Sequence, residues 1–217
     1  MAWIVPVTLS GSHAALVPLR AAHHDQLVEA AKDGELWKLW YTSVPSPEGM
    51  RSEIERRLDL QTKGSMLPFT VIEKSTELAV GMTTYMNIDT ENRRLEIGST
   101  WYQARVQRTA INTECKLLLL THAFESLNCI AVEFRTSSFN RASRRGIERL
   151  GAGLHLPRNK YTVETATAAI KLLLDNPRFS TTSAELASRM RDENAIGSAC
   201  DAIGSLLISN TRPVRGR

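Results

Sequence analysis

The chain has 217 residues, 42% of them hydrophobic, which is enough for one domain with an appendage or for two small domains. Its 27 Lys and Arg against 23 Asp and Glu give a formal charge of +4. This mild charge is spread along the chain, which argues against a basic nucleic-acid arm and suffices for an anionic small ligand. Three cysteines without metal-ligand spacing, Cys115, Cys129 and Cys200, favour a reducing, cytoplasmic setting. The first 20 residues have neither a basic start nor an unbroken apolar run, so we expect no signal peptide and no membrane span.

The first predicted elements are a short strand and two amphipathic helices. An apolar run over residues 14–19 predicts the strand, and the helix behind it has three residues at helical spacing, Leu27, Ala30 and Ala31. The second helix follows Pro47 and stops at Gly64. Its apolar residues recur at intervals of four, at Met50, Ile54 and Leu58.

Three strands are expected next, at residues 66–73, 77–86 and 94–102, because polar turns separate three strand-like runs. Together they predict an antiparallel meander. A loop over residues 103–113 then precedes a helix that is apolar round most of its circumference, which predicts a buried helix.

The last strand is predicted over residues 129–136, and Asn140 is a candidate N-cap for the helix that follows it. Beyond Pro157 the sequence pattern predicts helical segments, at roughly 163–174, 181–192 and 196–207. These patterns divide the chain into residues 1–152 and a helical extension at 153–217.

The loop over residues 103–113 has the position of an anion site. The N–H groups of a helix N-terminus are unpaired and lie at the positive end of the helix dipole, which accepts a phosphate. Donors for a diphosphate or a ribose phosphate would be Arg105, Arg108, Gln107, Thr109 and Asn112. A solvated basic loop explains the same residues, and both interpretations stay open.

A family resemblance is carried by the run "LEIGSTWYQARVQRTAINTECKLLLLTHAFESLNCIAVEFRTSSFNRASRRGIERLGA" and by the earlier "AAKDGELWKLWYTSVPSPEGM". Over about residues 8–152 the chain resembles the GNAT superfamily of acetyl-CoA-dependent N-acetyltransferases, in the branch of ribosomal-protein N-terminal acetyltransferases. The resemblance implies an α/β fold with a mixed, splayed sheet flanked by helices. It also implies acetyl transfer from acetyl-CoA, as cosubstrate and without a metal, to a primary amine, with a protein N-terminus as the expected acceptor.

The resemblance further implies where acetyl-CoA binds. The family's pyrophosphate loop, Q/R-x-x-G-x-G/A, corresponds to residues 107–112, where Ala110 replaces the first glycine and is followed by Ile111 and Asn112. A methyl group there is expected to crowd the diphosphate or to resist a positive φ. The thioester carbonyl is expected to meet backbone N–H groups where two parallel strands splay apart, at Ser99, Thr100, Trp101 and Tyr102.

Acetyl transfer also needs a neutral amine and a route for protons. By resemblance, Glu96 deprotonates the incoming ammonium, directly or through water, and an ordinary strand carboxylate is the alternative. Asn140 and Ser143 match an N-x-x-S pattern in which the Asn meets the pantetheine arm and the hydroxyl protonates the leaving thiolate. Helix capping explains Asn140 equally well. The tyrosine that many relatives use as the acid is absent, because Gly146 and Ile147 stand there.

Two further sets of residues have weaker signals. Trp37, Trp40 and Tyr41 resemble the acceptor-side helix of the family and are candidates for a peptide-binding cleft, with core packing as the alternative. His23 and His24 have no third ligand at metal spacing, so no metal is assigned.

The extension departs from the family pattern, which would continue into a hairpin with a long final strand. Residues 150–208 resemble instead the C-terminal tail of UDP-sugar-dependent glycosyltransferases, without the donor-binding signature that sugar chemistry needs. Its helices are expected to bury their apolar faces against the open sheet edge or against a second copy of the chain, as a homodimer would. The missing hairpin leaves a rival interpretation, a non-catalytic CoA-binding or scaffold protein. The expected partners are therefore acetyl-CoA and an amine, with no nucleic acid and no membrane.

Overall fold

The structure is a computed structural model that describes residues 3–137, 139–141, 143–144, 160, 162–178 and 181. Within these residues, six strands form one sheet in the order β1-β2-β3-β4-β5-β6. The strands are β1 (Leu9–Ser10), β2 (Ala14–Pro18), β3 (Met66–Glu73), β4 (Leu78–Asp89), β5 (Arg94–Tyr102) and β6 (Ala131–Glu133). The α-helices are α1 (His24–Lys32), α2 (Met50–Thr62), α3 (Ala110–Thr121) and α5 (Val163–Asp175). Short 3-10 helices are η1 (Ala21–His23), η2 (Leu36–Lys38) and η3 (Ala104–Val106), and η4 (His122–Ser126) is a π-helical turn.

The predicted meander is confirmed, because β3, β4 and β5 pair antiparallel in sequence order. β3 and β5 begin and end at the residues that the sequence predicts. β5 also pairs parallel with β6, but only over residues 94–96 against 131–133. The strand expected over 129–136 is shorter than predicted because its partner turns away after Glu96. The sheet is therefore mixed and splayed at its β5–β6 end, as the resemblance implies.

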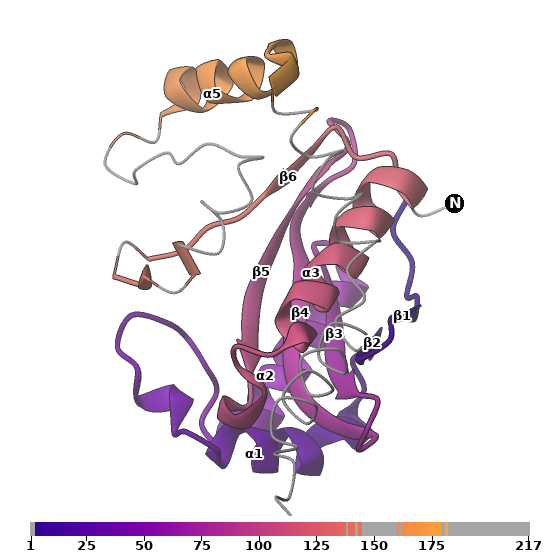
Figure 1. Ribbon diagram of the computed structural model, residues 1–217, viewed down its shortest axis with the longest axis vertical. Coiled ribbons are helices and arrows are strands. Elements are labelled where there is room, and N and C mark those ends of the chain that lie inside the picture. Colours follow the sequence, from indigo (N-terminus) through magenta and orange to yellow (C-terminus); the bar gives the residue numbers. More distant parts are fainter. Residues whose placement is uncertain are drawn as a thin grey trace, which may run out of the picture.

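Helices cover both faces of this sheet, which gives three layers (Figure 1). α3 packs on one face through an apolar cluster that includes Ile111 and Leu119. α1 and α2 pack on the other face through a cluster that includes Leu27, Met50 and Trp101. Because burying each such side chain stabilises the fold by about 1.5–3 kcal/mol, the two clusters fix the end of β5 between the α2 layer and the α3 layer.

The sequence prediction was wrong about where α3 begins and how it is buried. The helix starts at Ala110, so much of the expected loop over residues 103–113 is helical. The Thr109 side chain caps the helix by accepting a hydrogen bond from the Ile111 amide at 3.3 Å. Burial follows a single face with a spacing of four residues, at Ile111, Cys115, Leu119 and Ala123. Phe124 is 45% exposed, so the apolar circumference does not produce a fully buried helix.

The first helix predicted in the extension is confirmed as α5, drawn in orange at the top of Figure 1. Thr162 caps it, and the Thr162 amide donates a hydrogen bond back to the Thr165 hydroxyl at 2.9 Å. The helices predicted at 181–192 and 196–207, and the boundary at residues 152 and 153, lie outside the described residues apart from residue 181. None of the helices in the described part of the chain is long and apolar enough to cross a membrane.

Candidate functional site

The end of β5 carries a bulge next to the point where β6 leaves it. Met82 pairs with Trp101 and Thr84 pairs with Gly98, so Thr83 alone faces the two residues 99–100. Ser99 has a φ of +48°, a left-handed conformation that costs a residue with a side chain about 1–2 kcal/mol. Within the described residues, this strand has no β6 partner beyond Glu96. The predicted thioester site at Ser99–Tyr102 thus begins at an irregular backbone, pairs with β4 on one side, and has no strand partner on the other side in the described part of the chain.

A cleft of about 440 Å³ opens beside this bulge. It lies between α2, the segment that leads into α2, and the bulge itself. The residues that line it are Ser43, Val44, Pro45, Gly49, Glu53, Arg56, Arg57 and Ser99. Its charged residues are two arginines and one glutamate, which leaves one positive charge in excess. The cleft is therefore unsuited to a strongly cationic ligand.

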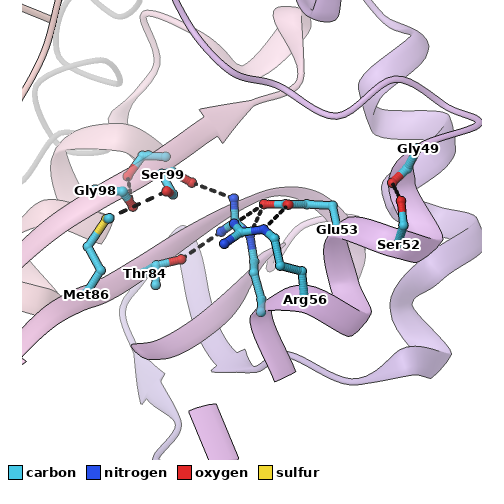
Figure 2. A network of polar contacts seen from close by, with 10 residues as sticks. Gly49, Ser52, Glu53, Arg56, Thr84, Met86, Gly98 and Ser99 are labelled. Atoms are coloured by element: carbon cyan, nitrogen blue, oxygen red, sulfur yellow. Dashed lines mark hydrogen bonds and ion pairs between the residues drawn. The ribbon is translucent and has the colours of Figure 1, made fainter. Parts of the chain in front are cut away.

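The charged side chains of the cleft form one network (Figure 2). The Glu53 carboxylate accepts hydrogen bonds from Arg56 at 2.7 and 2.9 Å and from Arg57 Nε at 2.7 Å. Burial acts to raise the pKa of Glu53, but the hydrogen bonds and charges of Arg56 and Arg57 outweigh burial and lower it. Glu53 is therefore ionised at neutral pH and partners both arginines.

Arg57 is the buried member of this network, with a side chain only 1% exposed. Its Nη1 donates to Thr84 Oγ1 at 2.7 Å, and its Nη2 donates to the Ser99 carbonyl at 3.1 Å. Sequence reasoning missed this residue and Glu53. The signal in the sequence was Arg57 itself, a charged residue four positions after Glu53 that shares the apolar face of α2. Leu58 was expected on this face instead, and it is only half-buried.

Glu96 lies on β5 just before the splay and is 4% exposed. Its Oε2 accepts hydrogen bonds from Asn87 Nδ2 at 2.6 Å and from Arg135, which also forms an ion pair with it. Its Oε1 faces Gly98, where an added Cβ would lie 3.1 Å away. The predicted base is thus a buried carboxylate with one oxygen bound by donors and the other directed along β5 toward the bulge.

The side chains of the predicted phosphate loop are mostly bound within the protein. The Arg105 guanidinium contacts the Glu73 carboxylate at 2.6 and 3.1 Å, and Gln107 Nε2 donates to the Tyr102 carbonyl at 3.0 Å. Thr109 is occupied as the helix cap and donates to the Val106 carbonyl at 2.7 Å. What the loop presents to solvent is the positive end of α3 together with the exposed Arg108.

The interpretation of Ala110 needs one correction. A positive φ was expected at this position, but Ala110 is the first residue of α3, and the positive φ of 63° belongs to Arg108. Since an alanine fits a helix well, the backbone does not resist the substitution at Ala110. Asn112 lies in the first turn of the same helix and is half-buried.

Asn140 is confirmed as a helix cap. The Ser143 amide donates to Asn140 Oδ1 at 3.1 Å, and the Arg144 amide donates to the Asn140 carbonyl at 3.0 Å. Only the Nδ2 end of Asn140 is left for a pantetheine arm. Ser143 is half-buried in this first turn.

An aromatic cluster lies near the cleft and outside any helix. Trp40 is 74% exposed, and its ring lies 4.7 Å from that of Phe139 and 5.8 Å from that of Tyr41. Trp37 is half-buried in η2. The alternative of core packing is therefore wrong for Trp40, whose contact with Phe139 joins the segment before the cleft to the segment after β6.

The two described cysteines are buried and free. Burial raises the pKa of Cys115 to about 12 and that of Cys129 to about 11, so both remain thiols at neutral pH. Within the described residues, no group of three or more His, Cys, Asp or Glu side chains could hold a metal ion. His23 instead contacts the Thr70 hydroxyl at 2.7 Å.

Comparison with known proteins gives a family. Residues 14–153 match the family described as the acetyltransferase (GNAT) domain. No curated protein matches the chain. The comparisons do not support the glycosyltransferase resemblance of residues 150–208.

Solved structures share the fold. A GCN5-related N-acetyltransferase from Brucella melitensis is 29% identical with a TM-score of 0.59, and the match covers 68% of each chain. A candidate ribosomal-protein-serine acetyltransferase from Vibrio cholerae is 21% identical with a TM-score of 0.62, over 73% of this chain and 91% of that one. An acetyltransferase from Salmonella typhimurium that modifies the N-terminal serine of 50S subunit protein L7/L12 is 18% identical with a TM-score of 0.57, over 66% and 83%.

Proposed function

The chain belongs to the GNAT acetyltransferase domain family, and from this premise we propose that it moves the acetyl group of acetyl-CoA to the N-terminal amine of a protein. The observation that carries the proposal is the bulged end of β5 beside the cleft, whose β6-side edge pairs with no strand among the described residues. Such an arrangement offers backbone N–H groups on one side and room for an amine on the other. With both described cysteines held as thiols, direct transfer to the amine is favoured over an acyl-enzyme.

The residues present fit acetyl-CoA, which supplies an activated thioester when bound. The positive end of α3, at the exposed residues 107–110, would hold the diphosphate. The bulged edge of β5, at residues 99–102, would polarise the thioester carbonyl. Asn140 Nδ2 would contact the pantetheine arm.

Proton transfer falls to Glu96 and Ser143. The amine nitrogen attacks the carbonyl carbon, and the carbon–sulfur bond breaks. The proton lost by the amine goes to Glu96, directly or through water, and Ser143 passes its hydroxyl proton to the thiolate and regains a proton from water. The half-buried position of Ser143 after β6 and the Oε1 direction of Glu96 along β5 support these roles.

A protein N-terminus is the acceptor that the cleft favours. Its excess positive charge disfavours polyamines, whereas a peptide brings one amine and several carbonyl oxygens that arginine can bind. The relative from Salmonella typhimurium acts on such an N-terminus, which supports the same acceptor class.

The test is an acetylation assay with thiol release and mass spectrometry as readouts. The panel contains peptides with a free N-terminus, the same peptides with that amine blocked, spermidine and glucosamine. We expect thiol release with the free peptides only and an added acetyl group on their α-amine. Thiol release no faster than acetyl-CoA hydrolysis across the whole panel would refute the proposal, and transfer to spermidine alone would refute the acceptor class.

A second candidate is a non-catalytic CoA-binding or scaffold protein. The observation that favours it is the internal use of Arg105 and Gln107, which withholds two side chains from the diphosphate. Isothermal titration with acetyl-CoA separates the two. Binding without thiol release to any amine would support the scaffold, and no binding at millimolar acetyl-CoA would refute both.

A further inference from the structure

We propose that Arg57 is a positioning residue for acetyl transfer, whose guanidinium fixes the carbonyl of Ser99 and with it the bulge at the end of β5. The inference rests on the proposed function, since it assigns to that bulge a catalytic task. Arg57 itself contacts none of the reacting atoms. It acts through the backbone of Ser99.

The contacts of Arg57 use three nitrogens of its planar guanidinium. Nε donates to Glu53 on α2, Nη1 donates to Thr84 on β4, and Nη2 donates to the Ser99 carbonyl on β5. The three partners lie on three different elements. A rigid, planar fork that joins all three sets the distance between the helix and the two strands at the bulge.

The position of Thr84 makes this arrangement specific to the bulge. Thr84 pairs with Gly98, the residue immediately before Ser99, and Thr84 is fully buried. Arg57 therefore holds β4 at the last regular pair and β5 at the first irregular residue. Any shift of Ser99 relative to Thr84 breaks one of the two hydrogen bonds.

The geometry of the peptide bond connects this contact with the direction of a backbone N–H group. The unit between Ser99 and Thr100 is planar and trans, so the Thr100 N–H points opposite to the Ser99 carbonyl. A carbonyl held toward α2 thus aims the N–H of Thr100 away from α2. Thr100 is one of the residues that the proposed function assigns to the thioester carbonyl, where a donor must be oriented in advance of reaction.

The energetics indicate that Arg57 does more than fill space between α2 and the sheet. A buried cation is expensive, and an apolar side chain of similar volume at the same place is often neutral or stabilising. The left-handed conformation of Ser99 adds its own cost. A buried charge that meets a strained backbone is the pattern expected where position, and not stability, is the requirement.

The test compares Arg57→Gln and Arg57→Lys with Arg51→Gln, an exposed arginine in the first turn of the same helix. Steady-state kinetics are normalised to the folded fraction measured by circular dichroism. We expect Arg57→Gln to lower kcat about 10- to 100-fold with the KM for acetyl-CoA within about 3-fold, because a misdirected donor loses part of the roughly 10²–10³-fold effect of an oxyanion donor. Arg57→Lys keeps the charge without the fork and should fall between. Arg51→Gln should match the wild type.

Amide hydrogen exchange gives a second readout that needs no activity. Exchange at residues 99–101 should be faster in Arg57→Gln or, if that variant does not fold, in Arg57→Lys, and unchanged in Arg51→Gln. Normal kcat in the folded Arg57 variants would overturn the inference, as would unchanged exchange at the bulge. A wild-type protein that transfers no acetyl group but shows the exchange effect would instead refute the proposed function alone, leaving Arg57 as the residue that holds the bulge.

Discussion

Two regions contact the second half of β5, and they use their polar side chains in opposite ways. On the α2 side, Glu53 holds Arg57, and Arg57 donates a hydrogen bond to the Ser99 carbonyl. In the loop before α3, Arg105 and Gln107 turn to groups elsewhere in the protein, a carboxylate on β3 and a carbonyl at the end of β5. The first region is built from side chains that position the backbone, and the second exposes the positive end of a helix.

This difference separates rate from affinity. Substitutions on the α2 side should disturb the geometry of the reacting group and lower kcat. Substitutions in the loop should have small effects on ligand affinity, because the helix end binds an anion through backbone N–H groups and the dipole.

The largest effect should come from Glu96, which lies on β5 before the bulge. Glu96→Gln removes the proposed base but keeps a polar group for Asn87, so kcat/KM for the amine should fall about 10²–10⁴-fold while acetyl-CoA affinity stays nearly constant. The matched control is Glu133→Gln, its register partner on β6. An unaltered rate in Glu96→Gln, measured by thiol release, would remove Glu96 from the mechanism.

Removing one arginine from each region should lower the free energy of unfolding by unequal amounts. Arg57→Ala removes the donor to the Thr84 hydroxyl and to the Ser99 carbonyl and leaves Glu53 with Arg56 alone, which should lower the free energy of unfolding by about 3–5 kcal/mol. Arg105→Ala removes an ion pair that is 42% exposed on the arginine side, which should cost no more than about 1 kcal/mol. Urea denaturation measures both. Equal losses would mean that the two regions do not differ as described.

The sequence predicts the strands of the sheet more accurately than the start of α3. β3 and β5 were predicted to the residue because turns bound strand-like runs on both sides, which is local information. The start of α3 was predicted too late because polar residues before an apolar helix resemble a loop. Thr109 as an N-cap was the local signal that the pattern did contain.

The networks around the site could not be predicted, because their partners are distant in the chain. Ser99 lies 42 residues from Arg57, and Arg135 lies 39 residues from Glu96. A single charge on an apolar helix face, such as Arg57, is compatible with a local ion pair alone. Only the packing of α2 on β4 and β5 shows that its guanidinium reaches a bulge.

A smaller effect tests whether the loop binds through its backbone. Arg108 has a φ of 63°, which costs about 1–2 kcal/mol for a residue with a side chain. Arg108→Gly removes this cost but adds about 0.4–1 kcal/mol of unfolded-state entropy, so a net stabilisation of about 0.5 kcal/mol is expected. Its Kd for acetyl-CoA should stay within about 3-fold of the wild type by isothermal titration.

The control for the loop is Ala110→Gly, which makes the backbone more flexible at the first residue of α3 without changing charge. At the first position of α3, glycine should destabilise the helix by at most about 1 kcal/mol. A tenfold loss of acetyl-CoA affinity in Arg108→Gly, with none in Ala110→Gly, would show that the Arg108 charge holds the ligand. The loop would then resemble the α2 side after all.

The smallest effect is a pH dependence on the α2 side. The pKa of Glu53 is lowered in the folded protein because Arg56 and Arg57 outweigh its burial, so its ionised form stabilises the fold at neutral pH. This contribution is complete above the unfolded pKa of about 4.5 and is lost as the pH falls through the lower folded pKa. Urea denaturation of the wild type and Glu53→Gln from pH 7 to pH 3 measures it, and the difference between the two cancels the titration of all other groups. The wild type should be the more stable at pH 7, and its advantage should shrink below pH 4.5. A difference that stays constant over this range would mean that Glu53 is not held by the two arginines, and the α2 side would lose the anchor for Arg57.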